Sequence, residues 1–179
     1  MSAWILRIGQ FDQLALRALV SRRAPWLDAA MRALTHLGSA PFTIAAATAL
    51  VFLSGPQLTD GATVSAFALA ASHALVQLLK RTVARPRPSL PPGVISLIAA
   101  PDRFSFPSGH SAATLSLALP LAMSLGPLPG VVLLALAMVV GLSRCYLGVH
   151  YPGDVLVGWI LALGAVLVAP ACLSFTGAL

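Results

Sequence analysis

The sequence predicts an all-α fold, an integral-membrane bundle of about five transmembrane helices with an amphipathic helix before them. Three observations indicate this class. First, 58% of the 179 residues are hydrophobic and only 9% are charged, whereas soluble domains carry about 25% charged residues. Second, several apolar stretches are long enough to cross a bilayer, which takes about 20 residues. Third, no strand-like alternation competes with them. We therefore expect one membrane-embedded domain over residues 1–179.

The segment 1–35 is expected to be amphipathic and to lie in the membrane interface. Its apolar side chains recur at helical spacing on one face, and its charged side chains cluster on the other. The apolar face is formed by Trp4, Ile8, Phe11, Ala15 and Leu19. Because Arg7 and Arg17 interrupt the apolar run, the segment fits an interfacial helix better than a secretory signal peptide.

The predicted transmembrane helices follow in five stretches. They are residues 37–53, 61–79, 107–125, 130–149 and 155–175. The links after the first and third stretches are short and rich in Gly and Pro, which predicts tight turns between antiparallel helices. The link 83–107 is long and contains six prolines. Because long loops are often functional, this link is expected to contribute to a site.

Ionisable side chains concentrate at the helix ends on one side of the predicted bundle. Because successive helices alternate in direction, four of these ends meet at one face. The residues that can converge there are Lys80, Arg87, His110, Arg144, His150 and Asp154. Cationic helix ends also occur where side chains simply reach lipid head groups. That alternative does not explain two histidines and an aspartate at the same face, where ionisable residues usually have a partner or a function.

A basic pocket of this kind suits phosphoryl transfer. The transition state spreads negative charge over the equatorial oxygens of the transferred group. Lys80, Arg87 and Arg144 can supply fixed positive donors, and arginine binds phosphate oxygens in bidentate fashion.

The stretch Pro107–His110 begins the third predicted span. The free N–H groups and the positive dipole end of a helix start favour an anion. Gly109 lets the backbone approach a ligand closely, and Ser108 adds a hydroxyl donor. His110 in the first turn can act as an acid or a base.

His150 and Asp154 are four residues apart across a Pro-Gly turn. A carboxylate that accepts from one ring nitrogen leaves the other nitrogen free to attack phosphorus. A buried histidine with a satisfied hydrogen bond is the commoner explanation for such a pair, and the pair alone does not decide between the two.

Three motifs occur in a set order: K-x6-R-P at 80–88, P-S-G-H at 107–110, and S-R-x5-H-x3-D at 143–154. Together they resemble the type 2 phosphatidic acid phosphatase superfamily, the lipid phosphate phosphatases related to vanadium haloperoxidases. The resemblance implies that His150 is the nucleophile that forms a phosphohistidine, that Asp154 orients it, and that His110 is the general acid. The residues implied to hold the phosphoryl oxygens are Lys80, Arg87, Ser108, Gly109 and Arg144.

The function expected from this resemblance is hydrolysis of a phosphate from a lipid phosphate or diphosphate, with no metal and no cofactor. The five acidic residues form no cluster that could hold Mg²⁺. An isoprenoid diphosphate such as undecaprenyl diphosphate is the preferred substrate. Phosphatidylglycerol phosphate, phosphatidate, lipid A and prenyl-phosphosugar phosphates are alternatives, and an anion- or lipid-binding transporter is the non-enzyme alternative. The expected partners are the substrate and membrane lipids, not nucleic acid.

The expected location is a bacterial inner membrane. The resemblance favours an active site on the extracytoplasmic face. The positive-inside rule favours the cytoplasmic face, because all Lys and Arg residues fall on the pocket side or in the N-terminal segment. One further residue, His73, shares a helix face with Gln77 and Lys80. An interhelical hydrogen bond is the preferred role for His73, and a role in catalysis is the alternative.

Overall fold

The computed structural model describes residues 3–176, and side chains from residue 9 to residue 175. This part of the chain is helical and contains no strand, only an isolated bridge between Pro86 and Phe104. The elements in order are α1 (Ala3–Val20), α2 (Pro25–Thr35), the 3-10 helix η1 (His36–Gly38), α3 (Ala40–Leu53), α4 (Thr59–Val83), α5 (Gly109–Leu125), α6 (Pro127–Tyr146) and α7 (Pro152–Thr176). The predicted all-α fold class is confirmed.

The number of membrane spans is close to the predicted number but not equal to it. Among the described helices, α4, α6 and α7 are long and apolar enough to cross a bilayer. A further candidate is the pair formed by Pro25–Gly38 and Ala40–Leu53, which is bent by 53°. The predicted span at 37–53 therefore begins earlier in the structure and is bent where η1 interrupts the helix. The remaining predicted span corresponds to α5, which has 17 residues.

The core of the bundle is α5, which packs against α4, α6 and α7. The sequence explains both of its ends. Ser108 is the N-cap, and its Oγ accepts a hydrogen bond from the Ser111 N–H. Gly126 ends the helix with φ of +83°, a conformation that favours glycine, and Pro127 then begins α6. Most of α5 is buried, so this short helix is the one that the others surround.

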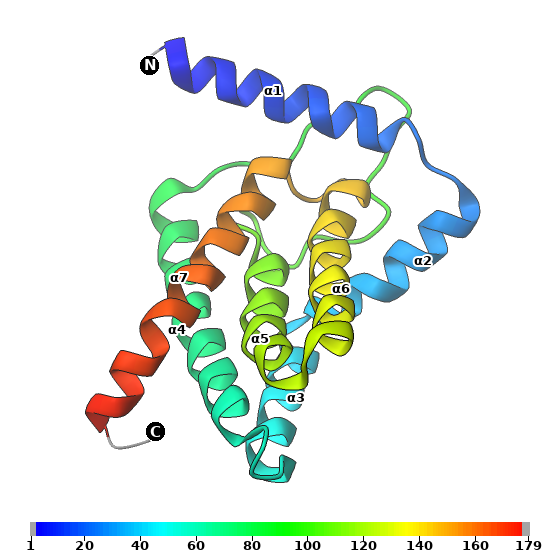
Figure 1. Cartoon of the computed structure of the whole chain (residues 1–179). Coiled ribbons are helices and arrows are strands. Elements are labelled where there is room, and N and C mark those ends of the chain that lie inside the picture. The colour runs from blue at the N-terminus through cyan, green and yellow to red at the C-terminus, as the bar shows by residue number, and fades with distance from the viewer. Residues whose placement is uncertain (1–2, 177–179) are drawn as a thin grey trace.

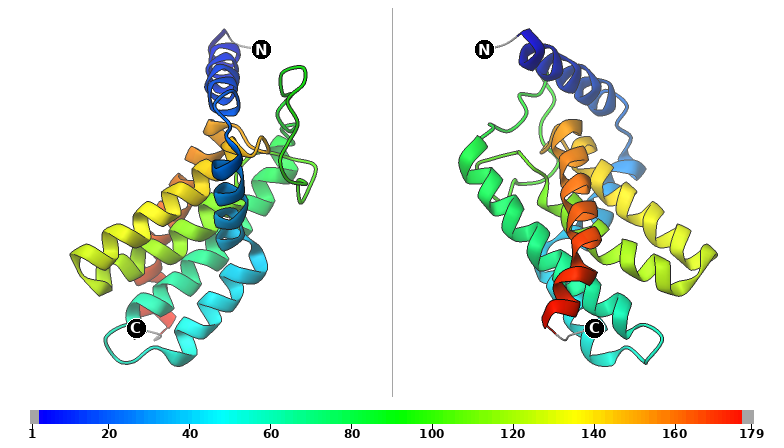
Figure 2. Two further views of the ribbon diagram at one scale, coloured as in Figure 1. Left: turned by 90° about the vertical axis from the view of Figure 1, so that its right-hand side faces the viewer. Right: turned by 60° about the vertical axis from the view of Figure 1, so that its left-hand side comes forward.

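The bundle has a head and a foot (Figure 1). The turn from α3 to α4, the turn from α5 to α6 and the end of α7 lie at the foot. The long loop between α4 and α5 and the connection between α6 and α7 lie at the head, where α1 crosses above them. Figure 2 shows α1 beyond the head of the bundle in two further views. The ends of α4 and α6 and the starts of α5 and α7 therefore share one face.

Helix α1 has a buried face and an exposed face. Asp12, Leu16 and Val20 are buried at successive helical turns, whereas Phe11 and Leu14 are exposed. The exposed apolar side chains agree with a position in the membrane interface, which stays a prediction. The side chains of Trp4 and Ile8, which belong to the predicted apolar face, lie outside the described part of the chain.

The long loop is fixed to the head of the bundle by backbone contacts. Its two ends meet where the Ser105 N–H donates to the Arg85 carbonyl at 2.9 Å. Its middle is held where the Leu97 N–H donates to the Leu147 carbonyl at 3.0 Å. The loop therefore lies against the connection between α6 and α7, which carries His150.

Candidate active site

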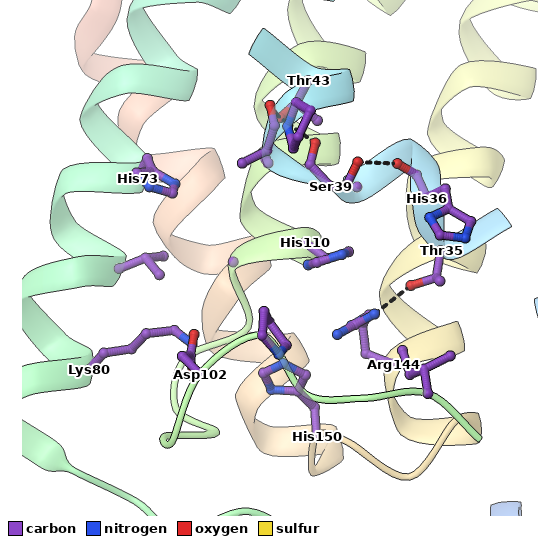
Figure 3. A pocket seen from close by; sticks show the side chains of 18 of the residues that line it. Thr35, His36, Ser39, Thr43, His73, Lys80, Asp102, His110, Arg144 and His150 are labelled. Atoms are coloured by element: carbon purple, nitrogen blue, oxygen red, sulfur yellow. Dashed lines mark hydrogen bonds and ion pairs between the residues drawn. The ribbon is translucent and has the colours of Figure 1, made fainter. Parts of the chain in front are cut away.

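A cavity of about 540 Å³ lies at the head of the bundle, where α4 ends and α5 begins. The predicted site residues that line it are Lys80, Gly109, His110, Arg144 and His150. Three further predicted residues do not line the cavity but adjoin residues that do: Arg87, Ser108 and Asp154. Figure 3 shows His110, His150 and Arg144 around one opening, with Lys80 on the side opposite Arg144. Helices that are far apart in the sequence thus bring the predicted residues together.

His150 is buried, and its hydrogen bonds indicate which ring nitrogen carries the proton. Its Nε2 atom lies 2.9 Å from Nη1 of Arg87. A guanidinium group has only donors, so Nε2 is the acceptor and the ring proton lies on Nδ1. Nδ1 lies 3.5 Å from Oδ2 of Asp154, at the outer limit of hydrogen-bonding distance. The ring lone pair is therefore on Nε2, where it accepts from Arg87.

The surroundings of His150 keep its ring neutral. Burial lowers the pKa of the imidazole to about 4; the Arg87 and Arg144 guanidinium groups add to this effect, and the Asp154 carboxylate opposes it. At neutral pH the ring is therefore uncharged. A neutral imidazole is the form that can act as a nucleophile or a base.

Asp102, in the loop between α4 and α5, forms ion pairs with two of the residues that are predicted to bind phosphate. Its Oδ2 lies 2.6 Å from Nζ of Lys80, and its Oδ1 lies 2.8 Å from Nη2 of Arg87. Burial would raise the pKa of Asp102, but Lys80 and then Arg87 outweigh burial and lower it. The Asp102 carboxylate occupies donors of Lys80 and Arg87 that could otherwise bind a phosphate. An incoming phosphate therefore competes with Asp102 for the same donors.

Arg144 is buried, with 1% of its surface exposed. Its Nη1 donates to Oγ1 of Thr35, the last residue of α2, at 2.6 Å. Its Nε makes no hydrogen bond to any residue between 3 and 176. A buried guanidinium with an unused donor is unfavourable unless an anion satisfies it. Arg144 is thus suited to hold an anion in the cavity.

The start of α5 is tied to the start of α7. The Ser108 N–H donates to the Asp154 carbonyl at 2.9 Å, and Ser108 Oγ accepts from the Ser111 hydroxyl at 2.8 Å. A Cβ on Gly109 would meet only Cγ1 of Val76, at 3.7 Å. The position where a side chain of residue 109 would lie is therefore not filled by the protein, and Gly109 lines the cavity. A contact from the Ser108 hydroxyl to phosphate stays a prediction.

His110 packs against η1, a contact that the sequence did not indicate. A Cβ on Gly38 would lie 2.9 Å from Cβ of His110 and 3.0 Å from its Cδ2. Such distances exclude any side chain at position 38 without a shift of the neighbours, so the glycine allows η1 to approach His110. The bend between α2 and α3 thus supports the ring of His110.

A second network lies behind His150 and joins α1 to the site. Nη1 of Arg85 lies 2.7 Å from Oδ1 of Asp154, and Nη2 of Arg85 lies 2.8 Å from Oδ2 of Asp12. The Asp12 carboxylate also accepts from the Gly153 N–H at 2.7 Å. The Arg85 guanidinium stacks 3.9 Å from the centre of the Tyr151 ring. Although burial opposes it, the Asp154 charge and the Asp12 contact raise the pKa of Arg85.

The sequence contained a signal for these additional residues. The chain has eleven Lys and Arg residues and only five acidic residues, all of them aspartate. A carboxylate in so apolar a chain needs a cationic partner. This ground points to Asp12 and Asp102, and the Arg-Pro-Arg-Pro stretch points to Arg85. Thr35 carried no comparable signal.

The fold and the site define a membrane-embedded phosphatase, and comparisons with known proteins give its family. The family model of the PAP2 superfamily matches residues 61–177, which include every residue predicted for the site. The chain belongs to the PAP2 superfamily, and it is a phosphatase. The resemblance found in the three motifs is confirmed.

The relatives found among characterised proteins are phosphatases. A decaprenylphosphoryl-5-phosphoribose phosphatase of Mycobacterium tuberculosis is 37% identical over 149 residues, which cover 83% of this chain and 79% of the relative. The protein of that description from Mycolicibacterium smegmatis is 38% identical over 146 residues, covering 80% and 77%. Phosphatidylglycerophosphatase B of Bacillus subtilis is 30% identical over 167 residues, covering 85% and 78%.

Two solved structures are similar to this chain along most of its length. Aquifex aeolicus LpxE superposes with a TM-score of 0.77 at 26% identity, covering 88% of this chain and 93% of the other. A PAP2-type phosphatidylglycerolphosphate phosphatase from Bacillus subtilis superposes with a TM-score of 0.73 at 27% identity, covering 92% and 85%. The chain therefore shares the fold of membrane phosphatases.

Proposed function

We propose that this protein removes a phosphate from a lipid phosphate monoester through a phosphohistidine on His150, without a metal ion. One observation carries the proposal. The neutral His150 has its lone pair on Nε2, beside the Arg87 guanidinium and within reach of the cavity that Lys80 and Arg144 also line. A nucleophile with a fixed tautomer among fixed cations is the arrangement that phosphoryl transfer requires.

The proposed reaction has two steps. Nε2 of His150 attacks phosphorus, and the bond from phosphorus to the lipid oxygen breaks. His110, protonated when the negatively charged phosphate is bound beside it, gives that oxygen its proton. The Nδ1 proton of His150 faces Asp154, which stabilises the positive charge that forms on the ring. Water then attacks phosphorus, His110 takes a proton from the water, the bond from phosphorus to Nε2 breaks, and phosphate leaves. Donors from Lys80 and the other cations bind the oxygens in both steps.

We propose a prenyl-phosphosugar phosphate as the substrate. The support is that relatives at 37% and 38% identity are named for decaprenylphosphoryl-5-phosphoribose. The relative at 30% identity is named for phosphatidylglycerophosphate, which is a weaker candidate. The isoprenoid diphosphate expected from the sequence stays a prediction, and release of phosphate from each purified lipid compares the three directly.

The covalent step is tested by rapid quenching with 32P-labelled phosphoryl substrate under single-turnover conditions. Wild-type protein is expected to carry an acid-labile, base-stable label, and His150→Ala is expected to carry none. His110→Ala is the matched control, because with p-nitrophenyl phosphate, whose leaving group needs no proton, it should still become labelled. Label on His150→Ala would contradict the choice of nucleophile, and an unlabelled wild type would contradict covalent catalysis.

A further inference from the structure

The catalytic cavity has a second zone, on the foot side of the phosphate-binding residues. This zone is lined by polar side chains from α2, η1, α4 and α3 with its N-cap. We call these side chains the polar belt: Thr35, His36, Ser39, Thr43, His73 and Gln77. Figure 3 shows His73 above Lys80 and shows Ser39 and Thr43 on the other side of the opening. The phosphate chemistry proposed above uses none of these side chains except Thr35, which binds Arg144.

The polar belt lies deeper along the bundle than the phosphate site. His73 precedes Lys80 by seven residues on α4, which is about 10 Å along a helix. His73 and Gln77 are exposed, although α4 is a candidate membrane span. Polar side chains at membrane depth are rare and usually meet a partner or serve a function.

The contacts of the polar belt leave much of its hydrogen-bonding capacity unused. Nε2 of His73 lies 3.3 Å from Nε2 of Gln77, one turn along the same helix. The preferred sequence interpretation, a bond from His73 to another helix, therefore does not match the structure. Across the cavity, the Ser39 and Thr43 hydroxyls donate to carbonyls of their own segment and remain able to accept. The belt can thus both donate to and accept from a ligand.

An apolar groove continues from the polar belt towards the foot of the bundle. It runs between α3 and α4 and shares Ala40, Thr43 and His73 with the catalytic cavity. Apart from Thr48, its further lining is apolar and includes Ile44, Ala47, Val51, Phe52 and Leu69. A second apolar groove, between α3, α5 and α6, shares no lining residue with the catalytic cavity. The cavity and the groove between α3 and α4 therefore form one continuous path, lined first by cationic, then by polar and finally by apolar side chains.

We infer that the polar belt is a binding subsite for a sugar and its inner phosphodiester, placed between the scissile phosphate and the hydrocarbon chain of the substrate. This inference rests on the proposed function. Sugar hydroxyls both donate and accept, which matches Ser39, Thr43 and Gln77. The histidines can donate to the phosphodiester. A chain attached directly to the phosphate would instead place methylene groups against these polar side chains.

The subsite makes the enzyme selective for lipids with a polar spacer. A site built to hydrogen-bond a polar group discriminates strongly against an analogue that lacks it, because the groups of the site are then left unpaired. Wild-type protein is therefore expected to have a kcat/KM for decaprenylphosphoryl-5-phosphoribose at least 100-fold above that for decaprenyl monophosphate, in the range such sites reach.

The test compares these two lipids in purified variants. His73→Ala and Gln77→Ala are each expected to raise KM for the sugar lipid by about 10-fold, a typical effect of one lost hydrogen bond to a ligand. Turnover of decaprenyl monophosphate should change by less than about 2-fold, which also shows that the variants fold. Leu78→Ala, an exposed position on α4, is the matched control and should leave both lipids unaffected.

The results separate this inference from the function on which it rests. Equal losses on the two lipids, or no loss on either, would overturn the subsite, as would a wild type that prefers decaprenyl monophosphate. In each of these cases a lipid phosphatase remains. If wild-type protein releases phosphate from none of the lipids, the result contradicts the proposed function itself, and the subsite inference falls with it.

The path of the chain gives a second measurement. Ala70 lines the groove between α3 and α4, and Ala46 lines the separate groove beside α5 and α6. Ala70→Phe is expected to lower kcat/KM for a C50 sugar lipid by at least about 10-fold, since it fills the path of the chain, and to spare a C10 analogue. Ala46→Phe is the control. The reverse result would place the chain in the other groove and break the continuity on which the subsite depends.

Discussion

At the scale of single residues, His150 shows how position alone sets chemical state. A free imidazole takes up a proton near pH 6.5, but the buried ring has a pKa of about 4. The contact from Arg87 places the lone pair on Nε2, and Asp154 faces the other nitrogen. Tautomer and charge are thus both determined before a substrate binds.

The lowered pKa of His150 predicts a pH-dependent stability. Between about pH 6.5 and pH 4, His150 is protonated in the unfolded chain but not in the folded chain. The free energy of unfolding therefore falls as the pH falls through this window. The contribution is about 3 kcal/mol at most. Thermal unfolding in detergent should therefore show a larger drop in Tm from pH 7 to pH 4.5 for wild type than for His150→Gln. Parallel curves for the two proteins would contradict the neutral buried ring.

The cation cluster predicts the response to inhibitors. Vanadate adopts the trigonal-bipyramidal geometry of the transition state, which Lys80, Arg87 and Arg144 are arranged to bind, so it should inhibit at micromolar concentrations. EDTA should have no effect, because the proposed chemistry uses only side chains. Arg144→Ala should weaken vanadate inhibition by about 100-fold, as expected for a lost charged contact. Activity lost in EDTA and restored by Mg²⁺ would disprove metal independence.

At the scale of secondary structure elements, α1 contacts and supports the connection between α6 and α7, which carries His150. Asp12 accepts from the Gly153 N–H and from Arg85, and Arg85 in turn holds Asp154. An element with an exposed apolar face is thereby tied to Asp154, the residue proposed to orient His150. The tie depends on one buried carboxylate.

Replacing that carboxylate should impair catalysis more than binding. Asp12→Ala leaves the Gly153 N–H and Nη2 of Arg85 without their partner, while Nη1 of Arg85 keeps its contact with Asp154. The expected cost is about 1–3 kcal/mol. We expect kcat to fall about 10-fold with KM nearly unchanged, because the phosphate-binding side chains are untouched. Hydrogen exchange in α1 should accelerate. Arg17→Ala, on the exposed face of the same helix, should be neutral, and equal effects of the two variants would exclude the proposed tie.

At the scale of the whole molecule, hydropathy accounts for the helices and for the end at which the charges gather. The predicted stretches 61–79, 130–149 and 155–175 differ from the observed α4, α6 and α7 by only a few residues at each end, because apolar length and Gly-Pro turns are local signals. The bend between α2 and α3 was not predicted, since it depends on the packing of Gly38 against His110. The contact of Asp12 with Gly153 joins residues 141 positions apart, and no local pattern encodes it.

The orientation of the molecule is tested with a thiol at the head. Ile95, in the loop between α4 and α5, is 74% exposed. Ile95→Cys, in a chain whose Cys145 and Cys172 are replaced by alanine and serine, should react with an impermeant maleimide in intact cells if the site is extracytoplasmic. A cysteine at Leu128, exposed near the foot, is the matched control and should react only after lysis. The opposite pattern would place the site in the cytoplasm.

The groove between α3 and α4 joins the cavity of the candidate active site from between two helices that are candidate membrane spans or parts of one. A substrate that uses this groove never leaves the bilayer, so its encounter with the enzyme is diffusion in two dimensions. The relevant concentration is then a surface density. Diluting the substrate with inert phospholipid should slow the reaction, whereas diluting the same vesicles in buffer should not change the turnover per enzyme. A Michaelis constant for this protein is therefore best expressed as a mole fraction of membrane lipid.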